Sequence, residues 1–174
     1  NFGALRTNSE WLCFSDADII FSKHFSIKIK ELISQNPNSF FIADKRERGI
    51  WGTVICRKEA FFKCGGYDEN IVGWGCEDDD LCQSLEKIGQ TSRTFPSDLI
   101  SHINHPFELC TKFQSIKDGA ESAKINLQYI KDKHRLLASA PDVSKQILRN
   151  LYFNIVLGRE KRPVIPYWYR ANNF

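Results

Sequence analysis

Residues 65–81 read Gly-Gly-Tyr-Asp-Glu-Asn-Ile-Val-Gly-Trp-Gly-Cys-Glu-Asp-Asp-Asp-Leu, and this stretch decides how the rest of the chain is interpreted. Trp74 lies between two glycines, and such small neighbours leave an indole face open to bind a sugar ring through its C–H surface. The four acids from Glu77 to Asp80 follow. A helix N-terminus favours acids because the backbone dipole is positive there, but this explains only about two of them. A carboxylate beside an open aromatic face can accept hydrogen bonds from hydroxyl groups and take a proton from one.

The size and composition of the chain are those of one globular domain. Of its 174 residues, 42 % are hydrophobic and 26 % are charged, which excludes a disordered chain. The net charge of +3 is too small to indicate nucleic-acid binding by charge alone. No run approaches the roughly 20 apolar residues that a membrane span needs. The sequence contains no methionine, so we expect a fragment or processed product of a longer protein.

The pattern of apolar and polar residues predicts a mixed α/β core. Short apolar runs rich in β-branched and aromatic residues predict strands at residues 10–14, 39–43, 50–56 and 91–103. Apolar residues at helical spacing, followed by stop signals, predict helices at residues 26–35, 57–63 and 76–88. Residues 1–8 fit the end of a helix that leads into the first strand.

The chain changes character near Pro106. Beyond it, helical patterns cover residues 117–138 and 143–157, with Pro141 between them. Residues 162–174 contain two prolines and several aromatic residues, which predicts an irregular tail. We therefore expect two domains, an α/β core at residues 1–106 and a helical extension with an aromatic tail at residues 107–174.

Two carboxylates, Asp16 and Asp18, follow the apolar run at residues 10–14. Acids at positions i and i+2 can reach one cation where the backbone bends, and oxygen ligands suit Mg²⁺ or Mn²⁺. Such a cation can hold a diphosphate and neutralise the charge that builds on it as it leaves. The alternative is a solvated strand end that caps a helix. The apolar neighbours Phe14 and Ile19 favour the metal site, because an acid beside apolar residues is costly without a partner.

His102 and His105 lie three residues apart near the end of the last predicted strand, so both can face one metal ion. Histidine is the commonest metal ligand near neutral pH. Taken alone, the pair fits two surface or core histidines with ordinary hydrogen bonds better than a metal site. Together with Asp16 and Asp18, the pair favours a shared metal ion.

The three features occur in a fixed order: Asp-x-Asp after an apolar run, then Gly-Gly-Tyr-Asp-Glu…Gly-Trp-Gly-x-Glu-Asp-Asp-Asp, then His-x-x-His-Pro. In this order they resemble the carboxyl-terminal half of an inverting GT-A glycosyltransferase. The likeness is greatest to the β-1,4-galactosyltransferase-like group and to bacterial family 2 enzymes that share its carboxyl-terminal module. The resemblance covers residues 1–106. It implies a GT-A fold whose amino-terminal nucleotide-binding strands are missing here, followed by a helical extension that the resemblance does not cover.

The resemblance also implies a role for each matched residue. The metal ligands would be Asp18, His105 and His102, with Mn²⁺ or Mg²⁺ as the cofactor. The donor side would contain Asp16, Asp18, Trp51, Gly52 and Gly73. The acceptor side would contain Trp74, Gly75, Glu77 and Asp78, with Asp78 as the catalytic base. Gly73 and Gly75 would let the loop around Trp74 move.

The implied reaction is a single displacement that inverts the anomeric carbon. It would move a hexose or N-acetylhexosamine from a UDP-sugar to a saccharide acceptor, in polysaccharide or glycoconjugate synthesis. We expect no nucleic-acid partner, and a cytoplasmic protein in peripheral contact with the inner face of a membrane, or a Golgi-lumen protein if the source is eukaryotic.

Two alternatives remain open at this point. One is a non-catalytic sugar-binding remnant that keeps Trp74. The other is a metal-dependent phosphoesterase built on the two aspartates of the Asp-x-Asp and the two histidines, which leaves Gly-Trp-Gly unexplained.

Overall fold

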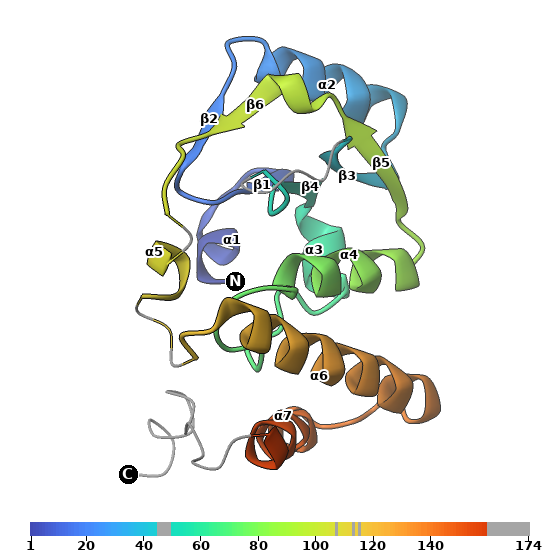
Figure 1. Cartoon of the computed structure of the whole chain (residues 1–174). Helices are drawn as coiled ribbons and strands as arrows, with labels where there is room; N and C mark the ends of the chain where they lie inside the picture. The colour runs from blue at the N-terminus through green and yellow to red at the C-terminus, as the bar shows by residue number, and fades with distance from the viewer. Residues whose placement is uncertain (45–49, 107, 113, 115, 160–174) are drawn as a thin grey trace. The chain divides into compact units, whose positions relative to one another are not determined.

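The computed structural model describes residues 1–44, 50–106, 108–112, 114 and 116–159 (Figure 1). These residues form two compact units. The first contains Asn1–Tyr67 and Asp78–His105, and the second contains Asp68–Glu77 together with the described residues from Pro106 onward. The tail predicted at residues 162–174 lies outside the described residues.

A four-stranded sheet with the order β1-β4-β3-β5 forms the centre of the first unit. Its strands are β1 (Trp11–Phe14), β3 (Ser39–Ala43), β4 (Val54–Arg57) and β5 (Thr91–Phe95). Strand β4 runs antiparallel to β1 and β3, and β5 runs parallel to β3. The central strands β3 and β4 are almost continuously apolar because both faces of the sheet are covered.

Successive side chains of the central strands enter two separate cores. Phe40 and Cys56 contribute to one core, whereas Phe41 and Ile55 contribute to the other. Helices α1 (Phe2–Arg6), α3 (Lys58–Lys63) and α4 (Glu77–Lys87) cover the first core, and α2 (Phe25–Gln35) covers the second (Figure 1). The predicted mixed α/β core is confirmed, and the predicted helices begin and end within about two residues of the observed ones. The finer assignment, a GT-A fold without its amino-terminal strands, stays a prediction.

A separate two-stranded ribbon joins β2 (Ile19–Phe21) to β6 (Ile100–His102). The strands are antiparallel, and Ile19 pairs with His102. The pairing continues beyond the ribbon, since the N–H of Ile103 donates to the carbonyl oxygen of Asp18 at 2.8 Å. The ribbon therefore brings the residues after the first apolar run next to the residues before Pro106.

Two predicted strands differ from the observed ones. The strand expected at residues 50–56 begins only at Val54, because Trp51 and Gly52 form a turn. The strand region expected at residues 91–103 is two strands in different sheets. Pro96 has no N–H to donate, and it ends β5 before the short 3-10 helix η1 (Ser97–Leu99). The helix α5 (Glu108–Thr111) was not predicted.

The second unit is built on two helices, α6 (Gly119–Ser139) and α7 (Lys145–Arg159), as predicted. Asp118 caps α6 by accepting hydrogen bonds from the backbone N–H groups of Ala120 and Glu121. The rings of Tyr129 on α6 and Tyr152 on α7 lie edge to face, with centroids 5.2 Å apart. No helix among the described residues is long and apolar enough to cross a membrane.

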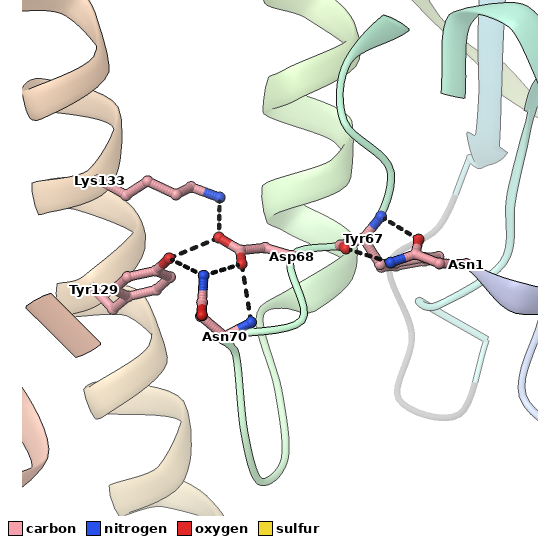
Figure 2. A network of polar contacts seen from close by, with 6 residues as sticks. All are labelled: Asn1, Tyr67, Asp68, Asn70, Tyr129 and Lys133. Atoms are coloured by element: carbon pink, nitrogen blue, oxygen red, sulfur yellow. Dashed lines mark hydrogen bonds and ion pairs between the residues drawn. The ribbon is translucent and has the colours of Figure 1, made fainter. Parts of the chain in front are cut away.

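The segment Asp68–Glu77 lies in the second unit, although we expected residues 1–106 to form one domain. The reason is a set of bonds at its first residue. The carboxylate of Asp68 lies 2.9 Å from Nζ of Lys133 and accepts a hydrogen bond from the Tyr129 hydroxyl at 2.8 Å (Figure 2). Ile71 and Val72 then pack against the core of the second unit.

The Asp68–Lys133 ion pair is largely closed to water, with side chains that are 13 % and 6 % exposed. Burial by itself raises the pKa of Asp68, but the Lys133 ammonium group and hydrogen bonds from Asn70 and Tyr129 outweigh it and lower the pKa below the ordinary 3.8. A carboxylate whose pKa is lower in the folded than in the unfolded chain stabilises the fold above the unfolded pKa. That stability is lost as the pH falls through the folded pKa.

We therefore expect Asp68→Asn to lower the free energy of unfolding at pH 7 by about 3–5 kcal/mol, because it leaves the buried Lys133 charge without its partner. The variant should also lose less stability than the wild type between pH 5 and pH 3. Urea unfolding followed by circular dichroism measures both. Asp132→Asn is the matched control: Asp132 pairs with the exposed Arg135 on the same helix, and its loss should cost about 1 kcal/mol or less. Equal effects of the two substitutions would contradict the assigned role of Asp68.

Candidate functional site

Carboxylates from two distant parts of the first unit lie against Gly52. A Cβ atom placed on Gly52 would lie 2.8 Å from Oδ2 of Asp78 and 3.2 Å from Oδ2 of Asp16. Phe14 at the end of β1 pairs with Val54 at the start of β4, so the residues after β1 and before β4 leave the sheet at the same edge. Only a glycine leaves room for both carboxylates at this point. The predicted donor residues Asp16 and Gly52 are thus next to the predicted base.

The environment of Asp16 disfavours its charged form. The surrounding protein raises the pKa of Asp16, chiefly by withdrawing its carboxyl group from water, and the Asp18 charge adds to the increase. A cation bound beside Asp16 and Asp18 would stabilise their charged forms, because its positive charge offsets their negative charges.

Tyr67 orients the carboxylate of Asp78. Its hydroxyl donates a hydrogen bond to Oδ1 of Asp78 at 2.9 Å, while Oδ2 is the oxygen that lies against Gly52. The backbone of Tyr67 is held on both sides by the side chain of Asn1, which donates to its carbonyl oxygen at 2.9 Å and accepts from its N–H at 3.0 Å (Figure 2). Its ring packs edge-on against Phe14. Sequence reasoning missed Tyr67, although it lies inside the stretch that was singled out.

The structure brings two of the three predicted metal ligands into contact. Nε2 of His105 lies 2.9 Å from Oδ2 of Asp18, and both side chains are partly exposed. This is a hydrogen-bond distance, so the two side chains lie close enough together to face one ion. His102 lies in β6, opposite Ile19. Among the residues that the structure describes, no group of three or more His, Cys, Asp or Glu side chains could hold a metal ion. The roles of these residues as ligands stay predictions.

The other predicted residues lie in two places. Trp51 is in the turn with Gly52 and is 40 % exposed. Glu77 is the first residue of α4, and the preceding loop of the second unit contains Gly73, Trp74 and Gly75. Trp74 is 37 % exposed, as its predicted role in binding requires.

The two glycines beside Trp74 have a structural purpose of their own. Their φ angles are +90° and +98°, in the region that side chains rarely adopt. A Cβ atom on Gly73 would also collide with Oγ of Ser122 on α6. The glycines therefore let the loop backbone approach the helix closely. Their predicted role in letting the loop move stays a prediction.

The match to known proteins falls on the same region. Residues 36–108 match the family model described as "N-terminal domain of galactosyltransferase". This stretch includes Gly52, Tyr67, Trp74, Asp78 and both histidines of the predicted site. Residues 36–108 are similar to a galactosyltransferase module. The predicted resemblance to the β-1,4-galactosyltransferase-like group is thereby confirmed. The likeness to bacterial family 2 enzymes and the assignment to a carboxyl-terminal half stay predictions.

A curated relative shares this likeness. Human β-1,4-galactosyltransferase 4 is 33 % identical over 97 residues, which cover 49 % of this chain and 27 % of that protein. The chain thus spans about a quarter of the length of the relative it matches. The mixed α/β fold is compatible with a glycosyltransferase domain.

The close approach at Gly52 leads to a test. Gly52→Ala should lower the free energy of unfolding by about 1–3 kcal/mol, because the new methyl group displaces the Asp78 carboxylate. In an Asp78→Ala background the same substitution should cost less, since the colliding group is gone. Urea unfolding of the four proteins gives both values. Gly3→Ala is the matched control, because nothing lies within 4 Å of the added atom. Equal costs with and without the Asp78 carboxylate would show that the packing at Gly52 is not as described.

Proposed function

We propose that this chain is part of the catalytic domain of an inverting, metal-dependent glycosyltransferase. It would move a hexose or N-acetylhexosamine from a UDP-sugar to a saccharide or glycoconjugate acceptor. The observation that carries this proposal is the approach of Asp16 and Asp78 to the same glycine, Gly52, which lies in the galactosyltransferase-like module.

Asp78 is the proposed base. Tyr67 holds one of its oxygens, and the carboxylate is fixed in one orientation before a substrate arrives. Asp78 would take the proton of an acceptor hydroxyl while that oxygen attacks the anomeric carbon of the donor. The new glycosidic bond forms as the bond from the anomeric carbon to UDP breaks. The electron pair of that bond leaves with UDP, and the configuration inverts.

Trp74 and Glu77 have the proposed acceptor roles. An exposed indole can pack on the apolar C–H face of a sugar ring, and Trp74 keeps more than a third of its surface exposed. Glu77 would accept a hydrogen bond from an acceptor hydroxyl group.

Asp18 and His105, whose side chains lie 2.9 Å apart, would bind Mn²⁺ or Mg²⁺. When bound, such a cation neutralises the charge that develops on a leaving diphosphate. Asp16, beside Asp18, would face the donor sugar or ribose.

Sugar binding without catalysis is the second candidate. The Trp74 loop lies in a unit with its own hydrophobic core, so sugar binding at Trp74 would not need the carboxylates of the first unit. We do not propose a phosphoesterase. A two-metal site needs more ligands than the Asp18–His105 pair, and the described residues contain no larger group.

Asp78→Asn tests the proposed base, because it keeps the shape of the side chain and removes its ability to take a proton. Transfer should fall by about 10²–10⁴-fold in the natural full-length protein, with metal-dependent UDP binding unchanged. Release of UDP measures transfer, and isothermal titration with UDP measures binding. Tyr67→Phe keeps the base and removes only its hydrogen bond, so it should cost about tenfold in kcat. Loss of UDP binding together with transfer in Asp78→Asn would overturn the role of Asp78.

The metal ligands can be tested without a substrate. Asp18→Asn and His105→Ala should each weaken Mn²⁺ binding at least about tenfold, because each removes a donor atom. Electron paramagnetic resonance of free Mn²⁺ measures the affinity. His24→Ala, at the N-terminal end of α2, is the control and should have no effect. Unchanged affinity in both site variants would exclude Asp18 and His105 as ligands.

A further inference from the structure

The loop that carries Trp74 is bonded to α6 on both sides of the indole. Oγ of Ser122 accepts a hydrogen bond from the N–H of Trp74 at 2.8 Å. Nδ2 of Asn126 donates to the carbonyl oxygen of Gly75 at 2.8 Å and to that of Trp74 at 3.4 Å. These bonds hold the peptide groups before and after Trp74, and the two peptide groups set the direction in which its side chain leaves the backbone.

The two side chains that make these bonds are fully buried. Ser122 and Asn126 are both 0 % exposed, and they lie one turn apart on the same face of α6. A buried polar group costs free energy unless it is hydrogen-bonded. On this face Ile125 and Tyr129 already supply apolar packing. The polar pair contributes what apolar residues cannot, namely bonds to the backbone around Trp74.

Helix α7 orients Asn126 in turn. The hydroxyl oxygen of Tyr152 lies 2.8 Å from the carbonyl oxygen of Val72 and 3.1 Å from Oδ1 of Asn126, and its single hydrogen is shared between these two acceptors. The same oxygen accepts from the Val72 N–H at 3.3 Å. Because Oδ1 faces Tyr152, the Nδ2 group of Asn126 faces the loop. Tyr152 therefore fixes the loop at Val72, two residues before Trp74. It also fixes the side-chain amide of Asn126, which holds the backbone after Trp74.

The start of the loop is fixed by charge. Asp68 is paired with Lys133 and accepts from Tyr129, and Asn70 bonds to both Asp68 and Tyr129 (Figure 2). Bonds from α6 and α7 thus occur at the beginning, the middle and the end of the segment Asp68–Glu77. The Trp74 side chain itself remains 37 % exposed.

We propose that Asn126 and Ser122 are positioning residues for Trp74. They hold the backbone on both sides of the indole, on whose face a pyranose ring would pack, so the helices after Pro106 control how tightly a sugar acceptor binds. This inference rests on the proposed function in one respect, that the molecule bound at Trp74 is a sugar.

The test labels the tryptophans of the whole chain with 5-fluorotryptophan. The sequence has four tryptophans, and Trp74→Phe identifies the fluorine resonance of Trp74. Asn126→Ala should shift and broaden that resonance and raise the acceptor KM about tenfold, as expected for one lost hydrogen bond, with the donor KM unchanged. Lys124→Ala is the matched control. Its side chain lies on the same helix and is 67 % exposed, so neither quantity should change.

Ser122→Ala provides a second variant should Asn126→Ala fail to fold. It removes one hydroxyl and leaves Asn126 in place, so the Trp74 resonance and the acceptor KM should change in the same direction by a smaller factor. An unchanged Trp74 resonance in the folded variants would overturn the proposal. A changed resonance with an unchanged acceptor KM would also overturn it, since the two residues would then be structural only.

A further titration separates this proposal from the proposed function. Methyl hexosides and methyl N-acetylhexosaminides are added to the labelled wild type and to Asn126→Ala. One outcome is that the wild type transfers no sugar, yet a glycoside shifts its Trp74 resonance and binds Asn126→Ala with about tenfold lower affinity. The proposed transfer then fails, and the positioning role stands. If no glycoside affects Trp74 in a protein that does transfer sugar, the positioning role fails alone.

Discussion

The close approach of the Asp16 and Asp78 carboxylates to Gly52 is the constraint on which the proposed site of the first unit depends. The antiparallel pairing of β1 with β4 brings Asp16 next to Gly52, and α4 carries Asp78. Both carboxylates fit against Gly52 because it has no side chain. Burial, together with the charge of Asp18, raises the pKa of Asp16. Tyr67 holds Asp78 by donating a hydrogen bond to its carboxylate. A cation bound at Asp18 and His105 would stabilise the charged form of Asp16.

A different constraint governs the loop that carries Trp74. Its position depends on the Asp68–Lys133 pair and on buried polar side chains of α6 and α7, whereas the Asp78 carboxylate depends on the sheet and on Tyr67. The proposed sugar-binding group, Trp74, thus depends on the core of the second unit, and the proposed base, Asp78, depends on a core of the first unit. The helices beyond Pro106, which the sequence left without a role, hold the one aromatic group proposed to contact the acceptor.

Much of the fold was predictable because it is local. The apolar run at β1, the helical spacing of α2 and the acids at the start of α4 each depend on residues a few positions apart. Tyr67 was not predictable, since a tyrosine after two glycines has no pattern that reveals its hydrogen-bond partner. Ser122 and Asn126 were missed for a related reason. Polar residues in an amphipathic helix are normally taken as its solvated face, and these two are buried.

The sequence by itself determined the order of the motifs, the alternation of α and β elements and the galactosyltransferase-like character of residues 36–108. Tertiary structure alone decided which distant groups are neighbours. Asp18 contacts His105 because Ile19 pairs with His102, and a register shift of one residue would have placed other side chains there. Strand register and helix packing depend on the free energy of the whole fold. Short-range patterns in the sequence therefore do not predict them.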